Sequence, residues 1–508
     1  MNSQCWFVGG LLVCCFVLYY RHLQSKKTTK AEPTEWPLLG HLFGTLANAS
    51  DFHDWATGVL AGTRYNFRAH MGLTGARFFL TCDPSNVRHI FISNSVNYPR
   101  GEEYADIFDV LGDGIFNAEG ESWRRQRAKA QLLMAAPRFR SFSARSSRDK
   151  VARSLLPFLA HAADAGARCD LHDVLLRLTF DMTCCLVFGV DPGCLQIGLP
   201  AVPLARAMDV VLETLFLRHV IPPACWRLMY RYEVGLEKKM AVARRTIERF
   251  AADTVAKRRS DHKLRDEGVG ESSDMLSSFI CSDDASEYSD EFLRDTIVNL
   301  LFAGRDTTGT VLSWFFYLLC KNPRVEHMIL DELAPIAATK KLDDTVVFDA
   351  SELSAMVYLH AALCECLRLY PSVPITHKAA AASDVLPSGH EMKAGDKILV
   401  YSYSMGRMED VWGKDCMEFC PERWVTDDGK LRYEPPYKFI AFNAGPRTCL
   451  GKEVAFTQMK AVAAAVLWNF ALEAVPGQIV KPKLSIILHM KNGLAVTVKR
   501  RNFTALHG

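Results

Sequence analysis

The residues best suited to chemistry surround Cys449, in the stretch Phe442-Asn443-Ala444-Gly445-Pro446-Arg447-Thr448-Cys449-Leu450-Gly451. One thiol lies between two glycines and beside a guanidinium, which suits a thiolate ligand for a haem iron. Such a ligand pushes electron density onto the iron and favours O–O cleavage. Gly445 permits a tight turn, and Gly451 lets a following helix approach the porphyrin. Arg447 is placed to bind a haem propionate. A buried structural cysteine is the alternative, but it would not explain why Phe, Gly, Arg, Cys and Gly all occur at this spacing.

A second polar group lies within an apolar helix predicted from Glu291 to Cys320 and stopped by Asn322-Pro323. Its central residues, Ala303-Gly304-Arg305-Asp306-Thr307-Thr308, are poor helix formers, and Gly costs about 1 kcal/mol. They therefore predict a local opening of the helix, where Thr307 offers a hydroxyl to bound oxygen and Asp306 relays protons. A Thr hydroxyl bonded back to the carbonyl four residues earlier is the structural alternative. A transmembrane helix is excluded because two charges would lie at its centre.

With these motifs in place, the chain resembles the cytochrome P450 superfamily, whose pattern Phe-x-x-Gly-x-Arg-x-Cys-x-Gly is matched from Phe442 to Gly451. The resemblance implies haem b, with Cys449 as the iron ligand and Phe442, Arg447 and Gly451 in the cofactor site. It also implies that Asp306 and Thr307 are catalytic, and that NADPH supplies electrons through a partner reductase. The expected fold is mainly α, with small β-sheets.

Two further motifs pair charged or aromatic residues on one helical face. Glu365 and Arg368 stand three residues apart, where they can form an ion pair. The resemblance implies that both join Arg423 in a buried structural network. Trp123 and Arg127 stand four residues apart. The resemblance implies that they bind a haem propionate; an indole packed in the core beside solvated arginines is the alternative.

The segment from Trp123 to Lys150 is strongly basic. It has nine Lys or Arg, at positions 124, 125, 127, 129, 138, 140, 145, 148 and 150, against one acid, Asp149. Such a run is usually a solvated face, but it can also steer an acidic electron donor. The chain has no dinucleotide-binding Gly-x-Gly-x-x-Gly. The resemblance therefore implies NADPH-cytochrome P450 reductase as the partner.

Length and composition indicate one large catalytic domain, expected at residues 41–508. The chain has 508 residues, 49% hydrophobic content and a net charge of +3, which does not favour a nucleic-acid partner. Its sixteen cysteines are scattered, without a zinc-type quartet, which indicates a reducing compartment.

The first twenty residues contain no charge, and Cys5 to Tyr20 is almost wholly apolar. Arg21, Lys26 and Lys27 follow this run rather than precede it. We therefore expect a transmembrane signal anchor at 1–20, a basic and Pro/Gly hinge at 21–40, and a cytosolic catalytic domain. The resemblance specifies a single-pass protein of the endoplasmic reticulum membrane, in contact with lipid. A cleaved secretory peptide is the alternative.

The remaining pattern predicts few strands. Phe78 to Thr81 and Lys397 to Tyr403 are expected as strands, and Leu484 to Lys499 as two strands around Lys491-Asn492-Gly493. The polar segment from Lys257 to Asp290 is expected as a solvated connector.

Analogy with the family predicts an apolar substrate pocket, which favours a hydrophobic substrate. Its expected lining is Phe108, Leu111, Phe116, Leu301, Ala303, Val373, Ile375 and Leu488.

Local details resemble one plant branch of the family. Asp191-Pro192-Gly193-Cys194 and Asn97-Tyr98-Pro99-Arg100-Gly101 are similar to the clan that hydroxylates fatty acids and alkanes, in particular its mid-chain alkane hydroxylase branch. That branch also contains enzymes similar to noroxomaritidine synthase, which couple two phenol rings. We favour hydroxylation of a long-chain alkane or fatty acid, with oxidative phenol coupling as the alternative, because the motifs do not separate the two.

Two other functional classes are considered. A haem-thiolate isomerase or dehydratase would be expected to lack the acid and alcohol pair Asp306 and Thr307. A haem-binding sensor or electron carrier would need neither a proton relay nor a substrate pocket.

Overall fold

The computed structural model describes residues 32–72, 77–264, 274–280, 288–340 and 345–501. The chain divides into two compact units, Met1–Pro99 with Ile375–Cys416, and Arg100–Pro374 with Met417–Gly508. The predicted anchor at 1–20 lies outside the described residues. Within the described ranges, no helix combines the length and the apolar character needed to span a bilayer.

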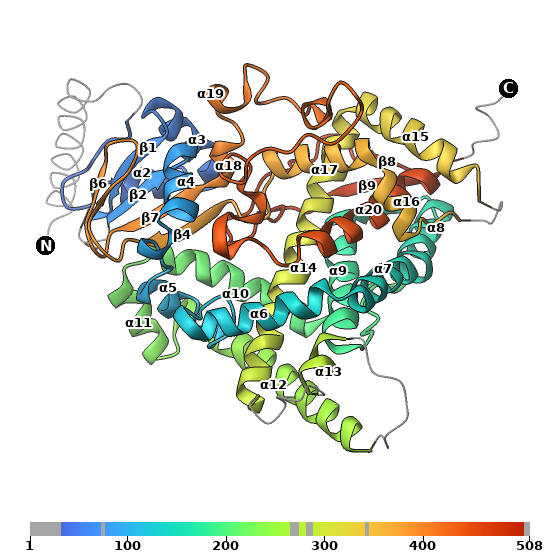
Figure 1. Ribbon diagram of the computed structural model, residues 1–508, viewed down its shortest axis with the longest axis horizontal. Helices are drawn as coiled ribbons and strands as arrows, with labels where there is room; N and C mark the ends of the chain where they lie inside the picture. Colours follow the sequence, from blue (N-terminus) through green and yellow to red (C-terminus); the bar gives the residue numbers. More distant parts are fainter. Residues whose placement is uncertain (1–31, 73–76, 265–273, 281–287, 341–344, 502–508) are drawn as a thin grey trace, which may run out of the picture. The chain divides into compact units, whose positions relative to one another are not determined.

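The first unit is built on a four-stranded sheet in the order β1-β2-β7-β4 (Figure 1). β2 and β7 pair in parallel, whereas β1 pairs with β2 and β4 with β7 in antiparallel fashion. The strands are β1 Asn66–His70, β2 Arg77–Thr81, β4 Ile375–Ala379 and β7 Lys397–Tyr401, beside the small pair β5 Asp384–Val385 and β6 Glu391–Met392. The helices are α2 Leu42–Ala47, α3 Phe52–Gly62, α4 Pro84–Arg88, α18 Ser402–Met405 and α19 Glu409–Trp412. Both predicted strands are confirmed, except that residues 402 and 403 begin α18.

The Pro/Gly stretch before α2 forms a closed turn. Trp36 and Gly40 exchange two backbone hydrogen bonds, of 2.8 and 2.7 Å. Leu38 within this turn has a φ of 64°. The His41 N–H then donates to the His70 carbonyl, which ties the turn to β1.

The second unit is mainly helical, which confirms the predicted fold class. Its α-helices are α5 Glu102–Ile107, α6 Gly120–Ala135, α7 Pro137–Lys150, α8 Leu156–Asp164, α9 Leu171–Phe188, α10 Pro203–Val220, α11 Pro223–Arg231, α12 Gly235–Leu264, α13 Met275–Ile280, α14 Asp290–Lys321, α15 Pro323–Ala337, α16 Ala350–Ala355, α17 Val357–Leu369 and α20 Lys452–Asn469. A three-stranded antiparallel sheet has the order β3-β9-β8, with β3 Arg168–Asp170, β8 Phe470–Ala474 and β9 Ala495–Arg500.

The predicted hairpin at 484–499 is only half right. Its second strand exists as β9, but β9 pairs with β8, and residues 484–490 do not form a strand. The reason lies in the partners of that segment. The Leu488 N–H donates to the Ser372 carbonyl, and the Ile486 N–H to the Leu212 carbonyl. These amides bind neighbouring loops and helices instead of a ladder.

The predicted solvated connector at 257–290 is wrong over much of its length. α12 continues to Leu264, and α13 covers Met275–Ile280. Leu276, Phe279 and Ile280 are buried in the core cluster of this unit, because apolar residues outweigh the serines around them. The rest of the connector, at 265–273 and 281–287, lies outside the described residues.

The long helix α14 is the axis of the second unit, and α9 packs along it (Figure 1). It begins where the Ser289 hydroxyl accepts the Phe292 N–H and ends at Asn322, close to the predicted bounds. The predicted opening near Gly304 is wrong, because α14 is continuous from Asp290 to Lys321. A Cβ at Gly304 would lie 2.5 Å from Thr183 Oγ1. This glycine therefore permits close packing of α9.

A buried ion pair between Lys150 and Asp181, joined by the exposed Asp191, explains the Asp191-Pro192-Gly193-Cys194 motif. Lys150 Nζ lies 3.0 Å from Asp181 Oδ2 and 2.8 Å from Asp191 Oδ1. Asp181 also accepts the N–H groups of Cys194 and Leu195. Burial opposes the charge of Lys150, but the two carboxylates outweigh it and raise the pKa of this ammonium. The motif thus fixes the loop after α9 to the end of α7.

We predict that Lys150→Met lowers the free energy of unfolding by about 3–5 kcal/mol, because it leaves the fully buried carboxylate of Asp181 without its cation. Arg148→Met, at an exposed position on the same helix, is the control and should change it by no more than about 0.5 kcal/mol. Urea unfolding of both variants measures the difference. Equal effects would contradict the structural role of the cluster.

Candidate active site

The loop that carries Cys449 is shaped by backbone hydrogen bonds. Asn443 and Gly445 have φ values of 63° and 64°, which confirms the tight turn predicted at Gly445. The Cys449 N–H donates to the Phe442 carbonyl over 2.8 Å. Gly451 follows as the N-cap of α20, with an ordinary φ of −82°. A Cβ there would lie 3.9 Å from Cys449 Sγ, in normal contact.

The Cys449 thiol is accessible although protein surrounds it. Its side chain is exposed, yet burial is the largest influence on its pKa and raises it. The Gly451 N–H, Arg127 and Lys452 offset only part of this effect. A further positive charge, such as an iron ion provides, would favour a thiolate at this position. The setting fits a metal-ligating cysteine.

The guanidinium of Arg447 has a hydrogen-bond donor to spare. Its Nη2 donates to the Ala118 carbonyl over 2.8 Å and to Glu119 over 2.5 Å. Its Nη1 is buried and has no partner among the described residues. The guanidinium lies 4.4 Å above the Trp123 ring. Burial lowers the pKa of Arg447, and the nearby Arg100 adds to this effect. A buried, unpaired N–H on a cation fits a carboxylate such as a haem propionate.

Arg127 and Trp123 lie beside this guanidinium on α6. Arg127 Nη2 donates to the Thr448 carbonyl, next to the thiol, over 2.8 Å. Its guanidinium lies 5.7 Å from the Trp123 ring. The predicted common face of these two residues is therefore directed at the Cys449 loop. The Phe442 ring packs against Phe456 of α20 at a tilt of 38°, with ring centroids 5.3 Å apart.

Sequence reasoning missed Arg100 as a site residue. The backbone N–H of Arg100 donates to Glu119 Oε1 over 3.0 Å, and its guanidinium lies 4.8 Å from the Tyr104 ring. Glu119 thus links Arg100 with Arg447. Two cations this close repel each other unless an anion lies near both. The sequence carried no spacing signal for this pair, since more than three hundred residues separate them.

Glu365, Arg368 and Arg423 lie together; Glu365 and Arg368 are buried, and Arg423 is partly exposed. Arg368 donates to both oxygens of Glu365 at 2.7 Å, and Arg423 Nε lies 3.5 Å from Glu365 Oε1. Glu365 also accepts the Trp424 indole N–H and the Cys420 N–H. With both side chains of the i,i+3 pair fully buried, the carboxylate has the partners that a buried charge needs.

Thr307 adopts the structural alternative named above. Its hydroxyl donates to the Ala303 carbonyl over 2.7 Å. Both residues remain partly exposed on a helix whose neighbouring residues are mostly buried. The hydroxyl must leave this carbonyl before it can serve a reaction.

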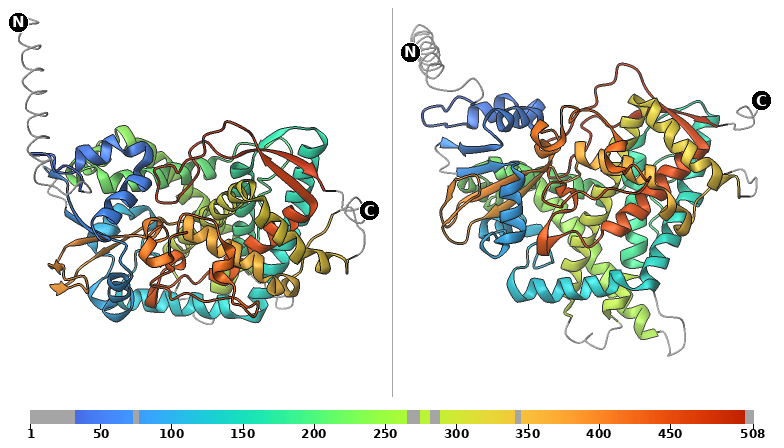
Figure 2. Two further views of the ribbon diagram at one scale, coloured as in Figure 1. Left: turned by 90° about the horizontal axis from the view of Figure 1, so that it is seen from above. Right: turned by 45° about the horizontal axis from the view of Figure 1, so that its top comes forward.

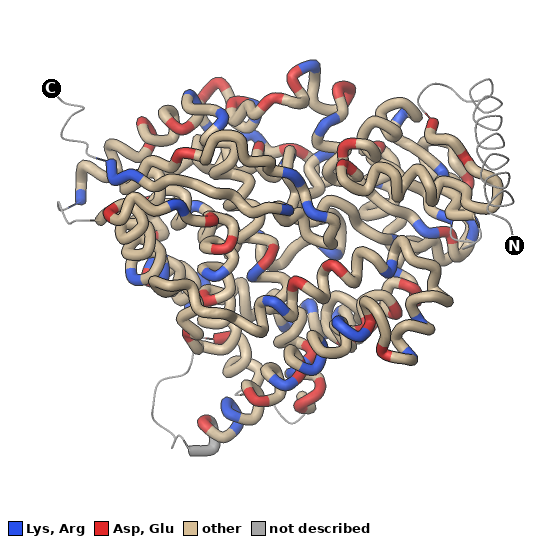
Figure 3. Tube along the Cα trace, turned by 180° about the vertical axis from the view of Figure 1, so that it is seen from behind, with Lys and Arg blue, Asp and Glu red and all other residues tan. Residues whose placement is uncertain are grey.

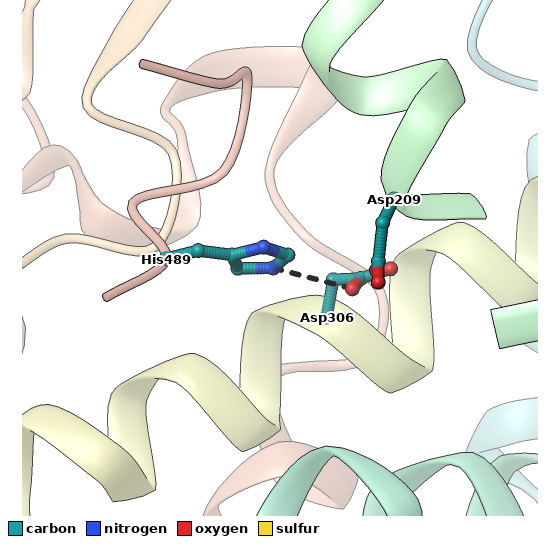
Figure 4. Close-up of side chains that lie close together, drawn as sticks. All are labelled: Asp209, Asp306 and His489. Carbon is teal, nitrogen blue, oxygen red and sulfur yellow. Dashed lines mark ion pairs between the residues drawn. The ribbon is translucent and has the colours of Figure 1, made fainter. Parts of the chain in front are cut away.

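Asp306 is fully buried and belongs to a charged group that joins three segments (Figure 4). Its Oδ1 lies 3.2 Å from Arg305 Nη1 and 3.2 Å from His489 Nε2. Arg305 Nη1 also lies 2.9 Å from Asp209 Oδ1 on α10. Burial would raise the pKa of Asp306, but Arg305 and His489 outweigh it and lower the pKa. The carboxylate is therefore ionised at neutral pH.

The same group does not form a metal centre. Asp209, Asp306 and His489 place one ligand atom each within 4.8 Å of one another. The Arg305 guanidinium already contacts both carboxylates and supplies the positive charge that a metal would bring. Sequence reasoning missed Asp209 and His489, because they come from segments far from Asp306 in the chain.

Most of the predicted pocket residues share one apolar cluster. Phe108, Leu111 and Leu301 are buried in it, and Phe116 and Val373 pack against it. Ala303 follows Leu301 on α14 and is partly exposed. Leu488 is fully buried and binds Ser372 and Trp314 through its backbone. Ile375 begins β4 in the first unit.

The same cluster contains apolar residues that the sequence analysis did not name. One group of them comes from α10 and from the segment before β9. These residues are Met208, Val211, Leu212, Leu215, Ile486 and Ile487.

The basic run on α6 and α7 is smaller than the count in the sequence. Lys150 is buried in its ion-pair cluster, and Arg127 binds the Cys449 loop. The exposed cations are Arg124, Arg125, Arg138, Arg140, Arg145 and Arg148. Figure 2 shows α6, in cyan, at an edge of the second unit in both views. Elsewhere along the chain both signs of charge are interspersed (Figure 3).

We expect Glu365→Gln to lower the free energy of unfolding by about 3–5 kcal/mol, because the buried Arg368 loses its counter-charge. Glu422→Gln serves as the control, since Glu422 forms an exposed ion pair with Arg324, and should cost about 1 kcal/mol or less. Denaturant unfolding measures both. A small cost for Glu365→Gln would show that the network does not hold this region.

Comparison with known proteins assigns the chain to a family. The family model described as Cytochrome P450 matches residues 31–498. Noroxomaritidine synthase 2 of Narcissus pseudonarcissus is 40% identical over 97% of this chain and 96% of the relative. Cytochrome P450 86B1 of Arabidopsis thaliana is 41% identical over 98% of this chain and 90% of the relative. Alkane hydroxylase MAH1 of the same plant is 40% identical over 96% and 97%. The chain belongs to the cytochrome P450 family of haem-thiolate monooxygenases.

Proposed function

We propose that this cytochrome P450 hydroxylates a long-chain alkane or fatty acid. The observation that carries the proposal is the apolar cluster around Phe108, Leu111 and Leu301, which continues along α14 toward Ala303 and Thr307. Side chains of this kind bind hydrocarbon by burial rather than by polar contacts. The similarity to alkane hydroxylase MAH1 supports the same substrate class.

The charges near this cluster favour a substrate, or a reacting part of it, that is uncharged. Arg218 is buried beside the cluster and donates to the Ile107 carbonyl. It is already neutralised by Glu237, which it contacts through Nε and Nη2 at 2.9 and 2.7 Å, and by Asp109 at 2.8 Å. Arg218 is therefore not available to bind a fatty-acid carboxylate. A carboxylate would have to remain outside the cluster.

Oxidative coupling of phenol rings is the second candidate. The observation in its favour is that noroxomaritidine synthase 2 matches this chain at 40% identity, as alkane hydroxylase MAH1 does. Both reactions use the same oxidant from the haem, so the pocket decides between them. The apolar lining leads us to prefer hydroxylation.

The residues of the site have separate roles in this proposal. Cys449 would ligate the haem iron, and Arg447, Arg127 and Trp123 would hold the propionates on the side of α6. When bound, the haem supplies activation of O2. Thr307 would move a proton through Oγ1 after its hydrogen bond to Ala303 breaks. Asp306, which Arg305 and His489 keep ionised, would take up protons and pass them on toward that hydroxyl.

Electrons would reach the site from NADPH-cytochrome P450 reductase. The exposed arginines of α6 and α7 would attract an acidic face of that flavoprotein and speed the encounter. Arg124 and Arg125 lie on α6, whose Arg127 binds the Cys449 loop, so docking there would bring the donor near the thiolate. We further propose that residues 1–20 anchor the protein in the endoplasmic reticulum membrane, with the catalytic part in the cytosol.

We predict that Thr307→Ala lowers the rate of product formation by about 100-fold while NADPH oxidation continues and peroxide accumulates. The reason is that the variant lacks the hydroxyl that delivers a proton. Thr307→Ser restores this hydroxyl and is the control. Product, peroxide and NADPH are measured in one reaction. An unchanged ratio of product to NADPH in Thr307→Ala would rule out the role in proton delivery.

The proposed function itself is tested by reconstituting the protein with the reductase and offering long alkanes, fatty acids and phenolic alkaloid precursors side by side. We expect NADPH-dependent O2 consumption and hydroxylated alkane or fatty acid. Coupled phenols without aliphatic products would establish the second candidate instead. Absence of substrate-dependent O2 consumption with every compound would contradict both.

A further inference from the structure

The segment between α5 and α6 is fixed to α14 by two side chains one helical turn apart. The segment comprises residues 108–118 and carries three of the predicted pocket residues. The side chains are Asp295 and Asn299, in the first part of α14. Both bind backbone groups of the segment, so they hold its path rather than a particular side chain.

Asn299 is the more complete of the two contacts. Its Oδ1 accepts the Phe116 N–H over 3.0 Å, and its Nδ2 donates to the Leu111 carbonyl over 2.8 Å. The same Nδ2 donates to the Asp295 carbonyl on its own helix over 2.8 Å. The residue is 1% exposed. A buried amide with these bonds is tightly oriented, because losing any of them leaves a polar group without a partner.

Asp295 adds a second contact nearer the start of the helix. Its Oδ2 accepts the Asp113 N–H over 2.9 Å. Arg294 Nε lies 3.7 Å from its other oxygen. Burial raises the pKa of Asp295, and the Asp113 N–H and Arg294 offset part of this rise.

Two glycines permit the segment to approach α14 this closely. A Cβ at Gly114 would lie 2.0 Å from Asn299 Nδ2, and one at Gly112 would lie 2.1 Å from Asp295 Oδ2. Gly112 also has a φ of 55°. A larger residue at Gly114 would have to displace the amide of Asn299 from its hydrogen bonds. The glycines and the two polar residues therefore form one arrangement.

This arrangement fixes residues 108–118 against α14, and both parts contribute side chains to the apolar cluster. Phe108, Leu111 and Phe116 come from the segment, whereas Leu301 and Phe302 come from α14, within three residues of Asn299. Leu111 and Phe116 are the residues whose backbone Asn299 binds. A change in these hydrogen bonds therefore moves residues whose side chains belong to the apolar cluster or pack against it.

We propose that Asn299, assisted by Asp295, is a positioning residue that selects which atom of the substrate is oxidised, by fixing residues 108–118 against α14. The effect on products rests on the proposed function, whereas the hydrogen bonds do not. The amide touches backbone and not the reacting atoms, so it acts through Leu111 and Phe116. It should therefore affect selectivity more than the capacity to oxidise.

The test compares Asn299→Leu, which has a similar volume but no hydrogen-bonding group, with Gly114→Ala, which leaves Asn299 in place. Asp295→Asn is the conservative variant, since its carbonyl oxygen can still accept the Asp113 N–H. Glu291→Gln, at an exposed position on the same helix, is the control. The carbon monoxide spectrum of each protein reports correct haem binding. If Asn299→Leu does not fold, Gly114→Ala carries the test.

Two readouts distinguish the hydrogen bonds of Asn299 from their effect on the products. Hydrogen exchange at the Phe116 amide, measured without substrate, should be about five- to tenfold faster in Asn299→Leu and Gly114→Ala. The ratio of positional isomers should change by about tenfold, because small differences in pocket contacts discriminate between similar groups by about tenfold or more. This ratio is measured with whichever of the alkanes, fatty acids or phenolic precursors the protein converts. Asp295→Asn and Glu291→Gln should retain the original ratio.

Unchanged hydrogen exchange at Phe116 in both variants would contradict the proposal that Asn299 fixes residues 108–118 against α14. Faster exchange with an unaltered isomer ratio would overturn its role in selectivity. If the wild type forms coupled phenols and no aliphatic alcohols, the proposed hydroxylation fails, and the ratio of coupled isomers then tests the positioning role.

Discussion

The proposed chemistry depends on one constraint, a negatively charged sulfur at Cys449, where the surrounding protein opposes that charge. Burial opposes a thiolate at Cys449, and the Gly451 N–H, Arg127 and Lys452 compensate only in part. A haem iron would supply the missing positive charge, and in return the loop supplies one accessible sulfur in a fixed place. The guanidinium of Arg447, whose buried Nη1 finds no partner in the described part of the chain, is suited to the anionic edge of the same cofactor. Cys449 would thus bind the positive iron of the haem, and Arg447 would bind its negative propionates.

The same logic of paired buried charges extends through the second unit. Asp306 is kept ionised by Arg305 and His489, and Glu365 lies 2.7 Å from Arg368 Nη2. Burying a single charge costs several kcal/mol, so each pair is retained as a unit. α14 combines these functions along one axis. Its first part fixes the segment before α6, its middle carries Asp306 and Thr307, and its glycine at 304 admits α9.

The sequence predicted the features that depend on neighbouring residues, and it missed those that depend on residues distant in the chain. The bounds of α14, the turn at Gly445 and the mainly α fold follow from local propensities and were predicted correctly. The strand expected at 484–490 failed because its amides bind carbonyls of other segments. The opening expected at Gly304 failed because the glycine serves packing against Thr183. Arg100, His489 and Asn299 had no local signal, since each acts through residues remote in the chain.

The most direct test of the central claim is the absorbance of the ferrous carbon monoxide complex in the purified protein, in Cys449→Ser and in Cys364→Ser. Cys364 is a buried cysteine of α17 and serves as the matched control. We predict a thiolate-type spectrum in the wild type and in Cys364→Ser, and its loss in Cys449→Ser. A thiolate-type spectrum that survives in Cys449→Ser, or an imidazole-type spectrum in the wild type, would contradict the account.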